Sequence, residues 1–324
     1  MTVPAAMQGR LSLPVIGAPM FIVSVPELVI EQCKAGIVGS FPALNARPQE
    51  MLEDWIVRIK AELAAFEAAS GRKAAPFAVN QIVHGSNSRL EHDVEVCIRQ
   101  HVPIIITSLR PPSEVVKAVH SYGGIVLHDV ISIRHAEKAL EQGVDGLILV
   151  CAGAGGHAGT LSPFALVSEI RGFYDGTVIL SGAIANGRAI LAAQAIGADL
   201  AYIGTRFIAT REANAKEEYK AMLVSGSAKD IVYTNAISGV HGNYLRPSLA
   251  AAGLDPDALP EADKTRMDFA AERKRPAAWR DIWGSGQGLG SITDVPSVAE
   301  CVARLRSEYL AAGRALDAAR FPEG

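Results

Sequence analysis

Short apolar runs alternate with longer amphipathic segments along this chain, and that alternation limits its fold more than any other feature. The runs are rich in β-branched residues, and they span residues 14–20, 36–41, 76–80, 103–107, 124–130, 146–151, 177–182 and 201–205. Each is mostly apolar without alternation, which is typical of parallel strands covered on both faces. Eight strand and helix units predict an α/β fold, a (β/α)8 TIM barrel, because a doubly wound sheet rarely needs so many evenly spaced repeats.

The chain after residue 225 has a different character. Residues 241–283 are rich in Pro, Asp and Ala and hold no strand-like run. We therefore expect residues 226–283 to form a mainly helical and loop excursion that shapes a substrate pocket. Residues 1–225 and 284–324 are expected to form the barrel domain, with a closing helix from about Val298 to Ala319. Some excursion side chains either line the pocket or pack in an ordinary core: Tyr244, Arg246, Trp279 and Trp283.

Composition argues against several partners. The 324 residues carry a formal net charge of −3 without a long basic cluster, so neither nucleic acid nor a membrane is expected as a partner. The four cysteines form no CxxC pair, and no HExxH spacing or GxSxG elbow occurs, so no metal site or serine nucleophile is predicted. The sequence has no leader-like start and no run of about 18 apolar residues, so a cytoplasmic protein with free thiols is expected.

Two loops of small residues follow the last two predicted strands. In a TIM barrel these are the loops that commonly bind phosphate. Here they read Ser181-Gly182-Ala183 and Gly204-Thr205. Small residues let backbone N–H groups point at an anion, Ser and Thr add hydroxyl donors, and a following helix start adds its dipole. Together the two loops predict a cofactor that carries a phosphate.

One histidine lies in a glycine-rich loop after the sixth predicted strand. The loop reads CAGAGGHAGT, from Cys151 to Thr160, and His157 stands among its glycines. Glycine permits a sharp turn and a close approach to a ligand, so His157 is predicted to act as a general base or donor beside a cofactor. A surface or backbone-bonded histidine is the alternative. The glycines also match the dinucleotide motif GxGxxG/A, but that motif should open a βαβ half rather than follow a sixth strand.

Polar residues stand at the ends of three other predicted strands. They are Asn80, Gln81, Ser108, His128 and Asp129. Because the carboxyl ends of barrel strands meet at one face, these side chains are expected to line one rim, where they could bond a cofactor ring or the substrate. For His128 and Asp129 a structural pairing is an equal alternative.

Six short motifs are spread in order over most of the chain. They are GAPM (17–20), FAVN (77–80), GAGGHAG (153–159), LSGAIANG (180–187), IGTRFIAT (203–210) and GQG (286–288). Together they resemble the FMN-dependent nitronate monooxygenases, formerly called 2-nitropropane dioxygenases. The resemblance implies a (β/α)8 barrel with FMN at its C-terminal face. The same superfamily includes NAD(P)H:quinone reductases and enoyl-acyl-carrier-protein reductases, so the motifs alone do not decide the reaction.

The resemblance also implies where FMN and substrate bind. The implied cofactor residues are Ala18, Pro19, Met20, Asn80, His128, Gly155, Gly156, Ser181, Gly182, Ala183, Gly204, Thr205 and Gln287. Among these, the two loops of small residues take the phosphate, and the GQG loop folds back over the site. His157 is implied as the catalytic base. Two nearby arginines, Arg206 and Arg211, could meet a cofactor phosphate or a helix C-terminus.

One position departs from the family pattern. Some relatives have a Lys directly after the fifth-strand His, where this chain has Asp129. A carboxylate cannot stabilise a negatively charged reduced flavin as an ammonium would. The tuning of the flavin and the subclass of the enzyme are therefore left open.

Three functions follow from these observations. The first is oxidation of alkyl nitronates, or of nitroalkanes deprotonated by His157, with FMN and O2, giving a carbonyl compound and nitrite. The second is an NAD(P)H:quinone or enoyl reductase, in which His157 binds rather than deprotonates. The third, a barrel that binds FMN without turnover, is disfavoured by the intact Gly-His loop. The expected partners are small molecules, a nitronate or NAD(P)H and a quinone, and a homodimer is compatible with the sequence.

Overall fold

The computed structural model describes residues 2–261 and 280–319, and at its centre lies a barrel of parallel strands. These strands are β1 (Val15–Gly17), β2 (Gly39–Pro42), β3 (Phe77–Val83), β4 (Ile104–Leu109), β5 (Ile125–Val130), β6 (Gly146–Val150), β8 (Thr177–Ser181) and β9 (Leu200–Ile203). They pair in the order β1-β9-β8-β6-β5-β4-β3-β2, and a bridge between Ile16 and Val38 closes the circle. Each of the eight predicted runs overlaps one barrel strand, so the predicted (β/α)8 TIM barrel is confirmed.

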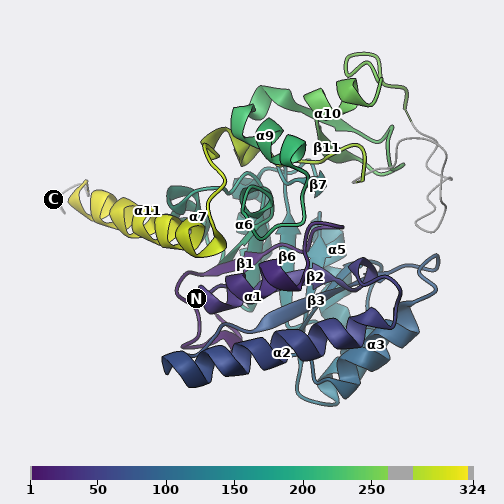
Figure 1. Cartoon of the computed structure of the whole chain (residues 1–324), viewed down its shortest axis with the longest axis vertical. Helices are drawn as coiled ribbons and strands as arrows, with labels where there is room; N and C mark the ends of the chain where they lie inside the picture. The colour runs from purple at the N-terminus through teal and green to yellow at the C-terminus, as the bar shows by residue number, and fades with distance from the viewer. Residues whose placement is uncertain (1, 262–279, 320–324) are drawn as a thin grey trace.

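Helices alternate with the strands and surround them (Figure 1). They are α1 (Pro26–Lys34), α2 (Met51–Ser70), α3 (Leu90–Arg99), α4 (Ser113–His120), α5 (Ile133–Glu141), α6 (Pro163–Arg171), α7 (Gly187–Ala195), α8 (Thr205–Ile208), α9 (Glu217–Ser225), α10 (Arg246–Ala251) and α11 (Val298–Ala318). Short 3-10 turns are η1 (Ala5–Met7), η2 (Ala43–Asn45), η3 (Ala228–Asp230) and η5 (Gln287–Ser291). The predicted closing helix is confirmed as α11, which packs on α7 and α1.

Side-chain caps set where several of these helices begin. Asn186 accepts a hydrogen bond from the backbone N–H of Ala189 at 2.9 Å and so starts α7. Ser297 and Glu300 form a reciprocal capping box at the start of α11. Such caps satisfy backbone donors that a helix leaves unpaired at its first turn. Because Asn186 follows Ala183 by three residues, its cap also fixes the end of the loop after β8.

The barrel strands are apolar on both faces. The residues that fill the barrel interior are Met7, Ile16, Val38, Ala78, Ile104, Ile106, Leu127, Ile148, Ile179, Leu200 and Tyr202. Their strand neighbours point the other way, because successive side chains alternate between the faces of a sheet. Val79, Val126 and Leu147, for example, belong to a larger cluster between the strands and the helices. This double burial explains why the strand sequences show continuous apolar runs.

A second, antiparallel sheet lies at one end of the barrel, beside α9 and α10 (Figure 1). It consists of β7 (Gly156–His157), β10 (Ile231–Thr234) and β11 (Gly242–Leu245), in the order β10-β11-β7, and we call it the hairpin sheet. The expectation that residues 241–283 lack a strand is therefore wrong for β11. Its first residues, Gly-Asn, are typical of a turn, but they form a strand because β10 pairs with them on one side and Gly156 and His157 pair with them on the other.

Three of the four side chains proposed to line the pocket have other surroundings in the structure. Tyr244 is fully buried in a small cluster with Leu249 and Ile282. Trp283 is buried and stacks on Tyr219, with ring centroids 4.9 Å apart. Arg246 forms an ion pair with Asp257 at 2.8 Å. These contacts favour the core-packing interpretation of the aromatic residues, and Trp279 lies outside the described residues.

Candidate active site

Four glycine-containing segments meet at the carboxyl ends of the barrel strands. The carbonyl oxygen of Gly153 accepts hydrogen bonds from the backbone N–H of Ala183 at 3.2 Å and of Gln287 at 2.9 Å. The backbone N–H of Gly286 donates to Thr205 Oγ1 at 2.9 Å. The structure thus brings together the loops after β6, β8 and β9 and the GQG segment.

Glycine is required where these segments cross. A Cβ on Gly155 would lie 2.8 Å from the backbone nitrogen of Gly286, and a Cβ on Gly286 would lie 2.8 Å from the carbonyl oxygen of Gly153. A Cβ on Gly288 would lie 2.8 Å from the carbonyl oxygen of Ala183. All three distances are shorter than a side chain tolerates against backbone. The GQG segment therefore reaches the loops after β6 and β8 only because these positions carry no side chain.

The loop after β1 adjoins the loop after β9. The backbone N–H of Ala18 donates to the carbonyl of Ile203 at 2.9 Å. A Cβ on Gly204 would lie 3.5 Å from both Ala18 Cβ and Met20 Sδ. The predicted cofactor residues Ala18–Met20 therefore border the predicted phosphate loop directly.

Three polar side chains form a chain of hydrogen bonds across β3, β4 and β5. Asn80 Nδ2 donates to Ser108 Oγ at 2.9 Å, and Ser108 Oγ donates to Asp129 Oδ2 at 2.7 Å. Asp129 Oδ1 and the hydroxyl of Tyr202 on β9 are buried without a hydrogen-bond partner among the described residues. Burial raises the pKa of Asp129 to about 6, with the Ser108 hydrogen bond opposing it, and also raises the pKa of Tyr202. We call Asn80, Ser108, Asp129 and Tyr202 the polar floor. Two of its atoms, Asp129 Oδ1 and the Tyr202 hydroxyl oxygen, are available for hydrogen bonds to a ligand.

His128 lies on the opposite side of β5 from this floor. Its Nδ1 is 2.8 Å from Thr107 Oγ1, and burial lowers its pKa to about 4. Its second neighbours on the strand, Val126 and Val130, belong to the apolar layer under the helices. Only one of two adjacent strand residues can face the barrel interior, and here that residue is Asp129. The structure therefore does not bring His128 to the other predicted cofactor residues.

His157 enters the site from the hairpin sheet. It pairs with Gly242 of β11, and its Nε2 lies 3.1 Å from Ser238 Oγ. The hydroxyl of Tyr244 donates to the same Ser238 Oγ at 3.1 Å. Burial lowers the pKa of His157 to about 4, so the imidazole is neutral at pH 7 and its basic form is present. Sequence reasoning missed Ser238, because a lone serine in a turn gives no signal of its own.

Comparison with known proteins assigns this site to a family. The sequence profile of the nitronate monooxygenases matches residues 7–308, which is nearly the whole chain. The chain belongs to the nitronate monooxygenase family. It is therefore an oxidoreductase, and enzymes of this family are in general flavin-dependent.

Two relatives of this chain are named for different activities. A nitronate monooxygenase of Paraburkholderia phytofirmans is 29% identical, over 91% of this chain and 92% of that protein. A protein of Rhodococcus jostii named (3aS,4S,5R,7aS)-5-hydroxy-7a-methyl-1-oxo-octahydro-1H-indene-4-carboxyl-CoA dehydrogenase is 26% identical, over 73% of this chain and 63% of that protein. The match to the dehydrogenase thus spans less than two thirds of its length. Among solved structures, nitroalkane oxidase of Streptomyces ansochromogenes covers 96% of this chain and 100% of its own, with 23% identity and a TM-score of 0.77, which shows the shared fold.

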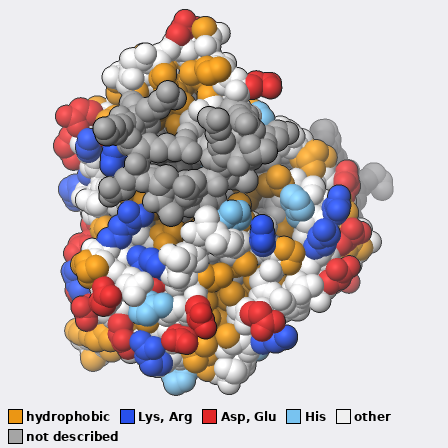
Figure 2. All heavy atoms as spheres, turned by 90° about the vertical axis from the view of Figure 1, so that its right-hand side faces the viewer, with side chains coloured by type: hydrophobic (Ala, Val, Ile, Leu, Met, Phe, Trp, Pro, Cys, Tyr) orange, Lys and Arg blue, Asp and Glu red, His pale blue; other side chains and the backbone are white. Residues whose placement is uncertain are grey.

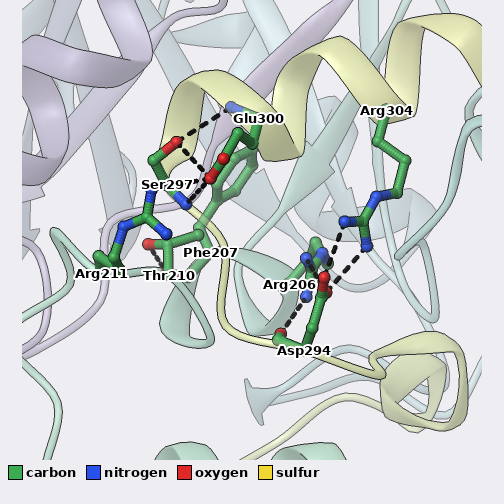
Figure 3. A network of polar contacts seen from close by, with 8 residues as sticks. All are labelled: Arg206, Phe207, Thr210, Arg211, Asp294, Ser297, Glu300 and Arg304. Atoms are coloured by element: carbon green, nitrogen blue, oxygen red, sulfur yellow. Dashed lines mark hydrogen bonds and ion pairs between the residues drawn. The ribbon is translucent and has the colours of Figure 1, made fainter.

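Arg206 and Arg211 both pair with carboxylates of the segment that leads into α11 and of its first turn (Figure 3). Arg206, which is 5% exposed at its side chain, pairs with Asp294 at 3.2 Å, and Arg304 holds the same carboxylate at 2.7 Å. Arg211 pairs with Glu300 in the capping box of α11 at 2.8 Å. Both arginines thus tie the segment after β9 to the start of α11. Arg206 directly follows the predicted phosphate loop Gly204-Thr205, so its ion pair with Asp294 anchors the chain next to that loop.

The surface and the remaining polar groups add few further features. On the face seen in Figure 2, acidic and basic side chains of the described residues are interspersed, and neither sign gathers into a patch. Within residues 2–261 and 280–319, no group of three or more His, Cys, Asp or Glu side chains could hold a metal ion. No helix in the same ranges is long and apolar enough to cross a membrane.

Proposed function

We propose that this enzyme uses FMN and O2 to oxidise alkyl nitronates, and nitroalkanes after their deprotonation, to a carbonyl compound and nitrite. One observation carries the proposal. The neutral imidazole of His157 is held beside the glycine loops at the carboxyl ends of the barrel strands, where the residues assigned to the cofactor meet. A neutral imidazole can take a proton from carbon, and a hydrocarbon proton beside a nitro group is acidic enough to be taken.

The residues present fit FMN. The loops Ser181–Ala183 and Gly204-Thr205 would take the phosphate, because they offer backbone N–H groups and two hydroxyls at the start of short turns. Thr205 Oγ1 already accepts a hydrogen bond from Gly286, so its own hydrogen is left to donate to an anion. When bound, FMN supplies the redox chemistry by accepting the substrate's electrons and passing them to O2.

The polar floor and the crossing glycines fit the ring of the same cofactor. Asn80 and Asp129, with the Tyr202 hydroxyl beside them, would bond the polar edge of a flavin, and the unpartnered Asp129 Oδ1 and Tyr202 hydroxyl would gain partners there. Ala18–Met20, Gly155, Gly156 and Gln287 would approach the ring closely, because glycine or short backbone segments border the space. We assign no cofactor contact to His128, because it faces the helices.

The role of His157 depends on the substrate offered. A nitroalkane must lose its α-proton before oxidation, and His157 would accept that proton. A preformed nitronate has already lost it, so the same enzyme should oxidise a nitronate without the base. Comparing the two substrates therefore isolates what His157 does.

One observation favours an alternative, an NAD(P)H:quinone or enoyl reductase on the same barrel. Asp129, with its pKa near 6, is largely ionised at pH 7 in the absence of a ligand, and it carries this charge at the floor of the site. A negative charge there disfavours binding of an anionic nitronate, whereas a quinone is neutral. The two functions differ in which compound reduces the flavin.

Anaerobic stopped-flow absorbance distinguishes the two. The purified protein, reconstituted with FMN, is mixed separately with an alkyl nitronate and with NADH or NADPH. Loss of the oxidised flavin absorbance with the nitronate alone supports the proposed function. Loss with NAD(P)H alone makes the enzyme a reductase, and a protein that cannot retain FMN overturns the flavin assignment.

A further inference from the structure

The carboxyl group of Asp129 lies in the polar floor with few groups to stabilise a negative charge. Its Oδ2 accepts the hydroxyl hydrogen of Ser108 at 2.7 Å, and its Oδ1 is buried without a hydrogen-bond partner among the described residues. A carboxylate held away from water needs several donors or a cation to remain ionised. Burial raises the pKa of Asp129, the Ser108 hydrogen bond lowers it, and no charged side chain contributes. The floor is therefore a poor site for an ionised Asp129.

The rest of the barrel does not supply the missing charge. Strands β1, β2, β3, β4, β6 and β8 hold no titratable side chain, and β9 holds Tyr202. His128 lies on the opposite side of β5, where α4 and α5 pack. Burial raises the pKa of Tyr202 and lowers the pKa of His128 to about 4, so both are neutral at pH 7. Further titratable side chains follow β3, β4, β6 and β9, and in the described part of the chain none of them pairs with Asp129: His84, Arg110, Cys151, His157 and Arg206.

Two neighbours in the floor have already committed their hydrogens. Asn80 Nδ2 donates to the carbonyl of Ile106 at 3.2 Å and to Ser108 Oγ at 2.9 Å, which uses both hydrogens of the amide. Because a carbonyl oxygen can only accept, Ile106 fixes this orientation of the amide. The single hydrogen of Ser108 goes to Asp129. Towards a ligand, Asn80 can therefore offer only its Oδ1, which is an acceptor.

The polar edge of the flavin ring has one N–H between two carbonyl groups. The acceptor of Asn80 suits the N–H, and the ring carbonyls then need donors. An ionised Asp129 would repel a carbonyl oxygen, whereas a protonated Asp129 can donate to it. Asp129 is still partly exposed, and a bound ring would cover it. Loss of contact with water favours the neutral form of a carboxyl group further.

We propose that Asp129 takes up one proton from solvent as FMN binds, and that it holds the flavin ring as a neutral hydrogen-bond donor. This rests on the proposed function, which supplies FMN as the cofactor. In the step, water or buffer gives up the proton, an O–H bond forms on the Asp129 carboxylate, and no bond of FMN changes. The loaded enzyme then has an uncharged floor, which no longer repels an anionic nitronate.

The proposal predicts how many protons accompany FMN at each pH. The pKa of Asp129 is about 6 without a ligand, so at pH 7.5 the group is mostly ionised and binding should take up about one proton. At pH 5 it is already mostly protonated, and the uptake should be close to zero. Burial lowers the pKa of His157 to about 4, so that imidazole is neutral at pH 7.5.

Titration calorimetry of the FMN-free protein measures this uptake. FMN is added at pH 5 and at pH 7.5, each in two buffers with different ionisation enthalpies, and the difference between the buffers gives the number of protons. The experiment is repeated with riboflavin, because the phosphate of FMN has a pKa of about 6 and could titrate by itself. We expect about one proton at pH 7.5 with both ligands. No uptake at pH 7.5, or a release, would overturn the proposal.

Two variants of the polar floor assign the proton to Asp129. Asp129→Asn keeps the size of the side chain and should abolish the uptake at pH 7.5. Tyr202→Phe is the matched control, because it removes the other unpartnered group of the floor and should still bind FMN with about one proton. Uptake that persists in Asp129→Asn would place the proton elsewhere and overturn the proposal. If that variant does not fold, the native protein at the two pH values still decides.

The dissociation constant of FMN gives a second readout. Between pH 6.5 and 8.5, binding to the native protein should weaken about tenfold per pH unit relative to Asp129→Asn, because each bound FMN requires one more proton. A constant ratio between the two proteins would contradict the inference. Failure of the native protein to bind FMN at any pH would instead contradict the proposed function, so the two failures are distinguishable.

Discussion

The barrel and the hairpin sheet contribute to one site by different means. Each barrel strand lies between two others and between two apolar layers, so its loops are placed by a structure of many repeated contacts. The hairpin sheet has one strand of two residues, Gly156–His157, and a small core around Tyr244. The barrel therefore fixes where the proposed cofactor loops meet, whereas a few hydrogen bonds in the hairpin sheet position His157, the proposed base. Binding and proton transfer should thus be separable by mutation.

Among these variants, His157→Asn is expected to separate proton transfer from cofactor binding most clearly. Loss of the general base should lower nitroalkane turnover about 10²–10⁴-fold, while FMN binding and nitronate oxidation change little. The measurement is kcat/KM for a nitroalkane and its nitronate, together with the FMN content. His241→Asn is the matched control, because it removes a neighbouring imidazole that stacks on Tyr233. If kcat/KM fell by the same factor for both substrates, the role of His157 would not be limited to proton transfer.

In the polar floor of the barrel, Asp129→Asn should change how the free energy of unfolding depends on pH. Burial raises the pKa of Asp129 to about 6 from 3.8, so the folded protein holds this proton more tightly than the unfolded chain. The native protein should therefore lose stability as pH rises from about 4 to about 6, and the variant should not. Above pH 6 the variant should be more stable by as much as about 3 kcal/mol, and below pH 4 the two should match. Urea unfolding of the FMN-free proteins at pH 4, 5, 6 and 7.5 measures this, and parallel curves would contradict it.

Gly155→Ala tests the junction between the two regions. The added Cβ would meet the backbone nitrogen of Gly286 at 2.8 Å, so the GQG segment must move. We expect a loss of about 1–3 kcal/mol in unfolding free energy and weaker FMN retention. Gly290→Ala is the control, because its Cβ would find only Ser227 Cα, at 3.8 Å. Unchanged FMN retention in the Gly155 variant would mean that the junction does not shape the cofactor site.

The smallest effect is expected from Arg211→Ala. Its pair with Glu300 is largely exposed, at 61% and 58% of the two side chains, so its loss should cost less than about 1 kcal/mol. Arg206→Ala should cost more, because that side chain is buried against Asp294. Thermal unfolding of both variants gives the comparison. A larger cost at Arg211 would make the start of α11 part of the scaffold that holds the predicted phosphate loop.

The sequence predicts the barrel well because each of its units is local. The run at 103–107 needs only its own β-branched residues and the following helix to read as a strand, and the structure has β4 there. The hairpin sheet is local only in part. The stretch Gly242–Leu245 begins with residues typical of turns. It pairs along its length with β10, which is near in sequence, and its first two residues also pair with Gly156 and His157, which are far away.

The site shows the same limit at single residues. Continuous apolar strands do not reveal which face is the interior, so the adjacent His128 and Asp129 could not be told apart from sequence. The structure decides this through the interior cluster to which Leu127 belongs. The same limit applies to Tyr202, which lies two residues after Leu200 and therefore on the same face of β9, because only the structure shows that this face is the interior. The assignment of His157 as the base remains a prediction.

The seam between β1 and β9 has a consequence for the synthesis of the protein. The partner of one edge of β1, Val38, follows it closely in the sequence, but the partner of the other edge, Leu200–Ile203, is synthesised much later. At ordinary elongation rates that interval lasts on the order of ten seconds or more. An exposed strand edge invites pairing with another nascent chain. The strand is only three residues long, and Pro14 and Pro19 flank it, so the open edge offers too few adjacent N–H and C=O groups for a neighbouring chain on the ribosome to pair with.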